Sequence, residues 1–277
     1  MKIDAHQHFC HFDPARDTWI TEGSMKAIRR DFSPDDLFPI LQQNGIKGCV
    51  AVQANNSEAE TQYLLDLAEQ HSFIKGVVGW VDLKADNLSE RLDFYSQYPK
   101  LKGFRIIPAN SYGYPEYLMN WDYKKGFKEI AKRGYTFDIL LKWSHLSTLE
   151  AYLNYADPQR MVIDHIAKPY IENKRIKQWA KDIKKVAKYR QVRCKLSGLI
   201  TEADWGKWKE SDLIPYIDVV FEAFGTTRIM YGSDWPVCLV AGTYERQLEV
   251  VTNYISKLTP YEQQKIMGLN AQRFYNL

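Results

Sequence analysis

Short apolar segments alternate with longer amphipathic segments along the chain. Residues 47–53 (KGCVAVQ) are apolar almost without interruption, which is typical of a strand buried on both faces of a parallel sheet. In the segment before it, Ser33 and Pro34 suit the N-cap and first position of a helix, and Asn44-Gly45 suits its end. The pattern predicts a helix followed by a buried strand, and this unit recurs toward the C-terminus.

The recurrence predicts about eight strands, each followed by a helical segment. After a first strand that leads into His6 and His8, further strands are expected at 47–53, 74–83, 101–108, 135–142, 160–166, 192–198 and 228–234. Helices are expected at 34–43, 60–71, 88–98, 123–134, 146–156, 174–190, 213–225 and 259–277. Eight such units in about 250 residues favour a single-domain α/β fold over residues 1–277, the (β/α)8 TIM barrel. A doubly wound open sheet is the alternative, but no glycine-rich phosphate turn follows the first strand.

Composition narrows the classes of partner. The 277 residues are 45% hydrophobic and 26% charged, as in an ordinary globular protein, and the net charge of +3 is too small to indicate a nucleic-acid partner. The basic stretch 174–190 has apolar residues at helical spacing, so we interpret it as an amphipathic helix with a solvated basic face. No leader and no apolar run near 18 residues is present, so we expect a cytoplasmic protein without a membrane partner.

Two histidines stand at the start of the chain. His6 and His8 are separated by one residue, and side chains at positions i and i+2 of a strand project from the same face. Two neighbouring imidazoles can bind a divalent metal or hold a polar substrate. They could also be surface histidines, because this short motif occurs widely.

Further polar residues lie where the other predicted strands end. In a TIM barrel the catalytic residues come from the C-terminal ends of the strands, so these residues are candidates for a site. They are Gln53, Asn55, Arg105, Asp164, His165, Lys168, Lys195, Ser197, Asp234 and Trp235. Structural alternatives remain for several of them: Asp234 could cap a helix, His165 could be a hydrogen-bonded core histidine, and Arg105 could form an internal ion pair.

Several of these residues lie in longer motifs that span the chain in order. The motifs are IDAHQHF (3–9), VQANNSEAETQYLLDLA (52–68), GFRIIP (103–108), VIDHIAKP (162–169), KLSGL (195–199), MYGSDWPV (230–237) and LNAQRFYNL (269–277). With them the chain resembles the amidohydrolase superfamily (amidohydrolase family 2). Within it, the chain is most similar to the lactonase group that includes L-fuconolactonases and L-rhamnonolactonases.

The resemblance implies a reactive centre made of His6, His8, His165 and Asp234. Members with two metals have a bridging lysine or glutamate and a further histidine on intermediate strands. GFRII and TFDILL offer neither in an obvious place. We therefore expect either one divalent ion, such as zinc, on His6, His8 and Asp234, or a site without metal.

The function implied is hydrolysis of a small lactone, most simply a sugar aldonolactone, by water. Asp234 would be the general base, and His165 would stabilise charge on the carbonyl oxygen. The residues expected to bind this small-molecule substrate are Arg105, Lys168, Gln53, Trp235 and Trp19. The two tryptophans could equally pack in the core.

Other functions remain open at this stage. The same scaffold supports metal-dependent decarboxylases and amide hydrolases, and the barrel could be a non-catalytic binding protein. A nucleotide enzyme is disfavoured because neither phosphate-binding glycine motif is present.

Overall fold

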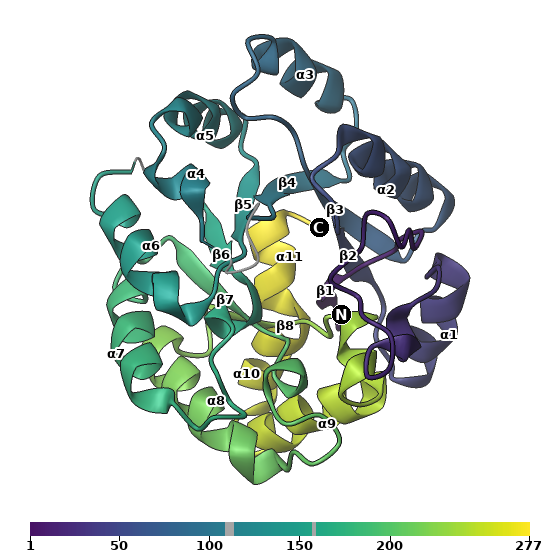
Figure 1. Cartoon of the computed structure of the whole chain (residues 1–277), viewed down its shortest axis with the longest axis vertical. Helices are drawn as coiled ribbons and strands as arrows, with labels where there is room; N and C mark the ends of the chain where they lie inside the picture. The colour runs from purple at the N-terminus through teal and green to yellow at the C-terminus, as the bar shows by residue number, and fades with distance from the viewer. Residues whose placement is uncertain (109–113, 157–158) are drawn as a thin grey trace.

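Eight parallel strands form one barrel in the order of the sequence (Figure 1). The structure, a computed structural model, describes residues 1–108, 114–156 and 159–277. The strands are β1 (Asp4–Gln7), β2 (Cys49–Val52), β3 (Ile74–Gly79), β4 (Leu101–Ile106), β5 (Thr136–Ile139), β6 (Met161–Ile163), β7 (Val192–Leu196) and β8 (Ile229–Tyr231). Each lies inside a segment predicted to be a strand, so the predicted TIM barrel is confirmed.

The barrel closes where the chain leaves β8 and meets β1. Gln7 pairs with Trp235 as a parallel bridge. The N–H of Asp234 donates to the carbonyl of His6 at 2.9 Å, and the N–H of His8 donates to the carbonyl of Trp235 at 2.7 Å. The first and last strand ends are therefore joined through the residues that sequence reasoning placed in the site.

Helices surround the barrel. They are α1 (Pro34–Gln43), α2 (Glu58–Gln70), α3 (Leu88–Tyr95), α4 (Glu116–Met119), α5 (Asp122–Lys132), α6 (Leu146–Leu153), α7 (Ile176–Val186), α8 (Glu210–Phe224), α9 (Tyr244–Ile255), α10 (Pro260–Gln264) and α11 (Asn270–Tyr275). The helix α4 and the longer α9, which Thr243 caps, were absent from the predicted elements. In the described residues no helix combines the length and apolar character needed to cross a bilayer.

The C-terminal segment was predicted as one helix over residues 259–277, but the structure divides it. A π-helical stretch, Lys265–Leu269, separates α10 from α11. At Gly268 an added Cβ would lie 2.0 Å from the carbonyl oxygen of Met1, so the N-terminus passes directly against the backbone there. The break lets α11 turn toward the barrel, where Phe274 and Tyr275 join the apolar cluster of strand residues such as Val78 and Val162 (Figure 1).

Candidate active site

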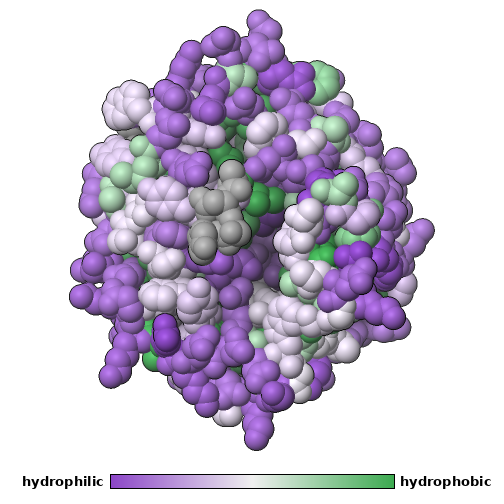
Figure 2. All heavy atoms as spheres, in the orientation of Figure 1, coloured by the Kyte–Doolittle hydropathy of each residue, from purple (hydrophilic) through white to green (hydrophobic). Residues whose placement is uncertain are grey.

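A cavity of about 770 Å³ opens at the C-terminal end of the barrel. Figure 2 shows a hollow near the centre of this face, among the loops that follow the strands. His8, Arg105, His165, Lys168 and Asp234 line the cavity. All five were candidates from the sequence, and they come from four strand ends, since His165 and Lys168 both follow β6.

The rings of His6 and His8 meet as the i, i+2 spacing predicted. Their Nε2 atoms are 3.2 Å apart, and both residues are buried. The Nδ1 atom of His8 lies 2.7 Å from the carbonyl oxygen of Val52, so Nδ1 carries the proton and the Nε2 lone pair faces the site. Of this pair, His8 lines the cavity and His6 does not.

His165 reaches the site through an unusual backbone. Residues 165–168 all have positive φ, between 46° and 62°, which costs each residue about 1–2 kcal/mol. The turn carries the His165 ring to 2.9 Å from the hydroxyl oxygen of Ser197. It packs against Gly198, where an added Cβ would be 2.9 Å from three atoms of His165. Strain that the surroundings enforce in this way is characteristic of functional sites.

Asp234 lies among the three histidines. Its carboxylate oxygens are 3.5 Å from His8 Nε2, 3.7 Å from His165 Nδ1 and 3.8 Å from His6 Nε2. Burial alone would raise the pKa of Asp234, but the neighbouring His165, His8 and Lys168 outweigh it and lower the pKa. Burial lowers the pKa values of His6 and His165 well below the usual value. At neutral pH the centre therefore contains an ionised Asp234 beside the neutral imidazoles of His6 and His165.

A buried ion network lies beneath the histidines. The Lys195 ammonium is 2.5 Å from Asp138, 3.1 Å from Asp164 and 3.0 Å from the Nδ1 atom of His6. The hydroxyl of Tyr275 donates to Asp138 at 2.7 Å. All five side chains are at most 1% exposed. Sequence reasoning placed Lys195 and Asp164 at strand ends but missed Asp138, a charged residue within the apolar strand TFDILL.

Arg105 is held by the protein rather than free for a ligand. Its Nη1 atom is 3.1 Å from Asp164 and 3.4 Å from His6, and Nε is 3.3 Å from the side-chain oxygen of Gln53. Its Nη2 atom donates to the backbone carbonyl of Gln53. Gln53 is fully buried and does not line the cavity, so its contact with Arg105 is structural. The internal ion pair that the sequence left open is present.

The remaining predicted substrate-binding residues divide into two kinds. Lys168 lines the cavity, and burial would lower its pKa, but Glu202 at 3.1 Å and Asp234 raise it. Trp19 lines the cavity and is 52% exposed. Trp235 is 1% exposed and packs against Phe32, so of its two alternatives the structure shows core packing.

Sequence reasoning missed polar residues that reach the cavity from loops and from α2. Arg16, Asn56, Glu60 and Tyr63 line it. Burial raises the pKa of Glu60 to about 7, although the N–H of Ala54 donates to its carboxylate at 2.7 Å. Glu60 belongs to the motif VQANNSEAETQYLLDLA, which the sequence analysis had already singled out. Helical periodicity alone, however, does not show which turn of the helix faces a cavity.

The donor atoms at the cavity floor suit one divalent ion. His6 Nε2, His8 Nε2 and the Oδ1 atom of Asp234 are 3.2–3.8 Å apart. His6, His165 and Asp234 also offer ligand atoms within 4.8 Å of one another. A histidine ligand commonly donates its other ring N–H to a carbonyl, as His8 does to Val52. Nitrogen and carboxylate donors of this kind fit zinc.

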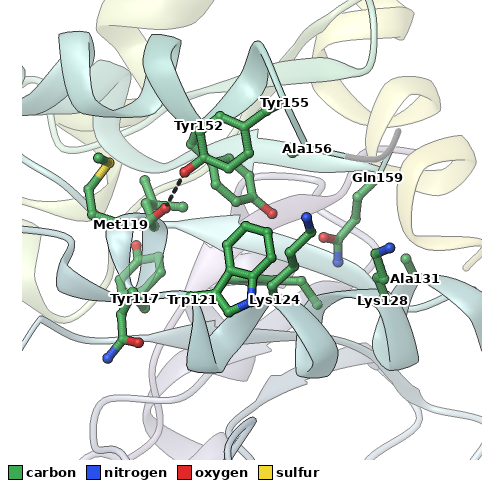
Figure 3. A pocket seen from close by; sticks show the side chains of 13 residues that line it. Tyr117, Met119, Trp121, Lys124, Lys128, Ala131, Tyr152, Tyr155, Ala156 and Gln159 are labelled. Carbon is green, nitrogen blue, oxygen red and sulfur yellow. Dashed lines mark hydrogen bonds between the residues drawn. The ribbon is translucent and has the colours of Figure 1, made fainter.

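A second, much smaller cavity of about 40 Å³ lies beside α4, α5 and α6 (Figure 3). Five of the thirteen residues that line it are aromatic, and the Lys124 ammonium lies 3.7 Å from the centre of the Trp121 ring. The hydroxyl of Tyr155 donates to the carbonyl of Leu118 at 3.0 Å. The histidines and Asp234 belong to the larger cavity, which is the candidate active site.

Nearly the whole chain matches a known protein family. The family model described as Amidohydrolase matches residues 3–277. The chain belongs to the amidohydrolase family. Two relatives of this family member are named L-fucono-1,5-lactonase. The one from Burkholderia multivorans is 33% identical over 287 residues, which cover 100% of this chain and 96% of that protein. The one from Burkholderia ambifaria is 34% identical over 284 residues, with the same coverage.

A solved structure bears on the metal. A crystal structure of an amidohydrolase from Burkholderia multivorans with bound zinc has a TM-score of 0.93 to this chain. The sequences are 34% identical, and the match covers 100% of this chain and 99% of that one. The family and the barrel predicted from the sequence are thus confirmed, and the described residues include groups that could hold a metal ion.

Proposed function

We propose that this protein hydrolyses a small lactone, and specifically an aldonolactone of a sugar. One observation carries the proposal: an ionised Asp234 lies among His6, His8 and His165 at the floor of the cavity. This arrangement provides a base for water, and the one serine that pairs with His165, Ser197, is fully buried and does not line the cavity. The similarity over the full length to proteins named L-fucono-1,5-lactonase supports the choice of a cyclic ester as substrate.

Asp234 takes the proton from water as the water oxygen attacks the lactone carbonyl carbon. The resulting tetrahedral species collapses, the ring C–O bond breaks, and the conjugate acid of Asp234 returns a proton to the leaving alkoxide. Each lactone molecule and one water molecule are converted into one hydroxy acid. The Asp234 carboxylate is regenerated. General base catalysis of this kind contributes roughly 100- to 10,000-fold to the rate.

Groups that line the cavity stabilise the oxyanion. The Nδ1 atom of His165 is engaged by the Ser197 hydroxyl at 2.9 Å, which leaves Nε2 as the ring nitrogen for substrate. Lys168 lines the same cavity, and the raised pKa keeps its ammonium charged. A cation and a neutral donor in a site of low dielectric favour the negative oxygen of the transition state.

The upper wall suits a hydroxylated ring. Arg16, Asn56 and Glu60 present polar groups to the cavity, and Trp19 offers a flat apolar face. Polar groups that pair with ring hydroxyls, and an aromatic surface that covers the C–H face, are complementary to a sugar lactone.

One divalent ion would be held by His6, His8 and Asp234. When bound, it would polarise the lactone carbonyl as a Lewis acid. Its binding would draw on the Asp234 carboxylate, which also serves as the base, so we propose one weakly held ion rather than a tightly bound pair.

The experiment is a proton-release assay of the purified protein with L-fucono-1,5-lactone and a panel of aldono-1,4- and aldono-1,5-lactones. Linear esters, amides and aromatic carboxylates are tested alongside, and Asp234→Asn is the matched control. Turnover of sugar lactones that the control lacks is expected. Turnover of amides, or carbon dioxide release from carboxylates, would instead indicate another amidohydrolase reaction. Saturable ligand binding without turnover would indicate a binding barrel.

A further inference from the structure

The Lys195 ammonium occupies a site built from potential metal ligands. His6, Asp138 and Asp164 together offer three ligand atoms within 4.8 Å of one another. Lys195 lies 2.5–3.1 Å from a ligand atom of each. All four residues are completely buried. A lysine side chain from β7 therefore supplies the cation that this set of donors can bind.

This contact determines which nitrogen of His6 carries the proton. An ammonium can only donate, so the Nδ1 atom of His6, 3.0 Å from Lys195, accepts. Because Nδ1 accepts, the ring proton lies on Nε2. The reverse tautomer would direct an Nδ1 proton at Asp164, 3.3 Å away, but it would also face the closer Lys195 ammonium.

The Nε2 proton has an acceptor on the site side. His8 Nε2 is 3.2 Å from His6 Nε2, and the other nitrogen of His8 already donates to Val52, so His8 Nε2 can accept. Arg105 also approaches His6 Nε2, but at 3.4 Å, and its Nη1 atom donates to Asp164 at 3.1 Å. These contacts therefore favour two successive hydrogen bonds, in which Lys195 donates to Nδ1 of His6 and Nε2 of His6 donates to Nε2 of His8.

We propose that Lys195 is a positioning residue that holds His6 in its Nε2-protonated tautomer and thereby opposes metal binding by His6 and His8. A metal ligand must present a lone pair, and here the proton of His6 lies between the two Nε2 atoms. Metal-binding histidines usually direct their second nitrogen at an acceptor, as His8 does, whereas His6 meets a cation. The tautomer of His6 and its effect on metal affinity do not depend on the proposed function. Only the catalytic consequence rests on it, namely that the site hydrolyses lactones without tightly bound metal.

The first test measures the tautomer directly in the metal-free wild-type protein. Two-bond ¹H–¹⁵N correlation spectra of protein labelled at histidine distinguish the two neutral tautomers, and His6 is assigned through its backbone. The Nε2-protonated pattern is expected at neutral pH. An Nδ1-protonated His6 overturns the proposal, and this result requires no variant to fold.

The second test measures zinc affinity by competition with a chromophoric chelator. The variant is Lys195→Met/Asp138→Asn, which removes one charge of each sign. It also removes one ligand from the set formed by His6, Asp138 and Asp164, so that zinc cannot bind there instead. At least tenfold tighter zinc binding is expected. The matched control is Lys168→Met, which removes a cation near Asp234 that lies against Glu202 rather than His6.

The control separates the tautomer from simple electrostatics. A gain in zinc affinity confined to the double variant supports the proposal. An unchanged affinity, or an equal gain in Lys168→Met, overturns it. Neither test uses lactone turnover, so a failed lactone screen would refute the proposed function while leaving this inference intact.

Discussion

The guanidinium of Arg105 pairs with Asp164, with Nη1 3.1 Å from the carboxylate oxygen and neither side chain more than 3% exposed. Burial would raise the pKa of Asp164, but Lys195 foremost among its neighbours holds it well below the usual range. Asp164 thus remains ionised inside the barrel and needs its cations. The main role of Arg105, although it lines the cavity, is therefore to stabilise the buried Asp164 carboxylate and not to bind substrate.

We predict that Arg105→Met lowers the free energy of unfolding by about 3 kcal/mol, the lower end for breaking a buried ion pair, because it removes one of the two cations beside the buried Asp164 carboxylate and leaves Lys195. Urea denaturation followed by circular dichroism measures the loss. The control is Arg133→Met on the surface, whose ion pairs should contribute at most about 1 kcal/mol. Normal stability with a raised Michaelis constant would instead restore the substrate-binding role expected from the sequence.

The base is tested by Asp234→Asn, which keeps the shape of the side chain but removes the charge. The catalytic rate should fall by roughly 100- to 10,000-fold with little change in the Michaelis constant. Steady-state kinetics on a lactone that the wild type hydrolyses provides the measurement. Asp86→Asn, at an exposed position before α3, is the control. A folded Asp234 variant with nearly normal turnover would contradict the assignment.

The sequence was sufficient to predict that His6, His8, His165 and Asp234 lie close together. Period-two alternation was enough to bring His6 and His8 together, and the rule for strand ends was enough to bring His165 and Asp234 to them. Both rules depend only on local geometry and parallel topology. The fold followed from the same regularity, because eight strand and helix units repeat.

Pairings across the barrel could not be predicted in this way. In the strand register Asp138 is level with Val162 of β6 and through it with Arg193 of β7, two residues before Lys195. The contact between Lys195 and Asp138 therefore depends on the register of both strand pairs and on the reach of the lysine side chain. Trp235 follows Asp234 directly in sequence, yet it turns into the core while Asp234 enters the cavity. Sequence shows which residues stand at a strand end, but the turn after the strand decides their direction.

Gly198 tests the packing of His165. An added Cβ would lie 2.9 Å from the ring, and φ is +61°. We predict that Gly198→Ala displaces His165 and lowers the catalytic rate at least tenfold. Gly45→Ala is the matched control, since φ is +66° there and nothing lies within 4 Å. It should lose only about 1 kcal/mol of stability from backbone strain and keep its activity. Equal kinetics in the two variants would show that His165 does not need this space.

Asp4 should give the stability a distinct pH dependence. Burial raises its pKa to about 6, although the hydrogen bonds from Ser233, His6 and Tyr244 oppose the shift. The folded protein then binds a proton more tightly than the unfolded chain, whose aspartate titrates near 4. The stability that Asp4 contributes is fully present below pH 4 and is lost as pH rises through 6, by up to about 3 kcal/mol. In Asp4→Asn this loss is absent, so the variant should gain stability relative to wild type between pH 4 and 7. Urea midpoints across this range measure the difference, with Asp86→Asn as the exposed control, and a difference independent of pH would contradict the raised pKa.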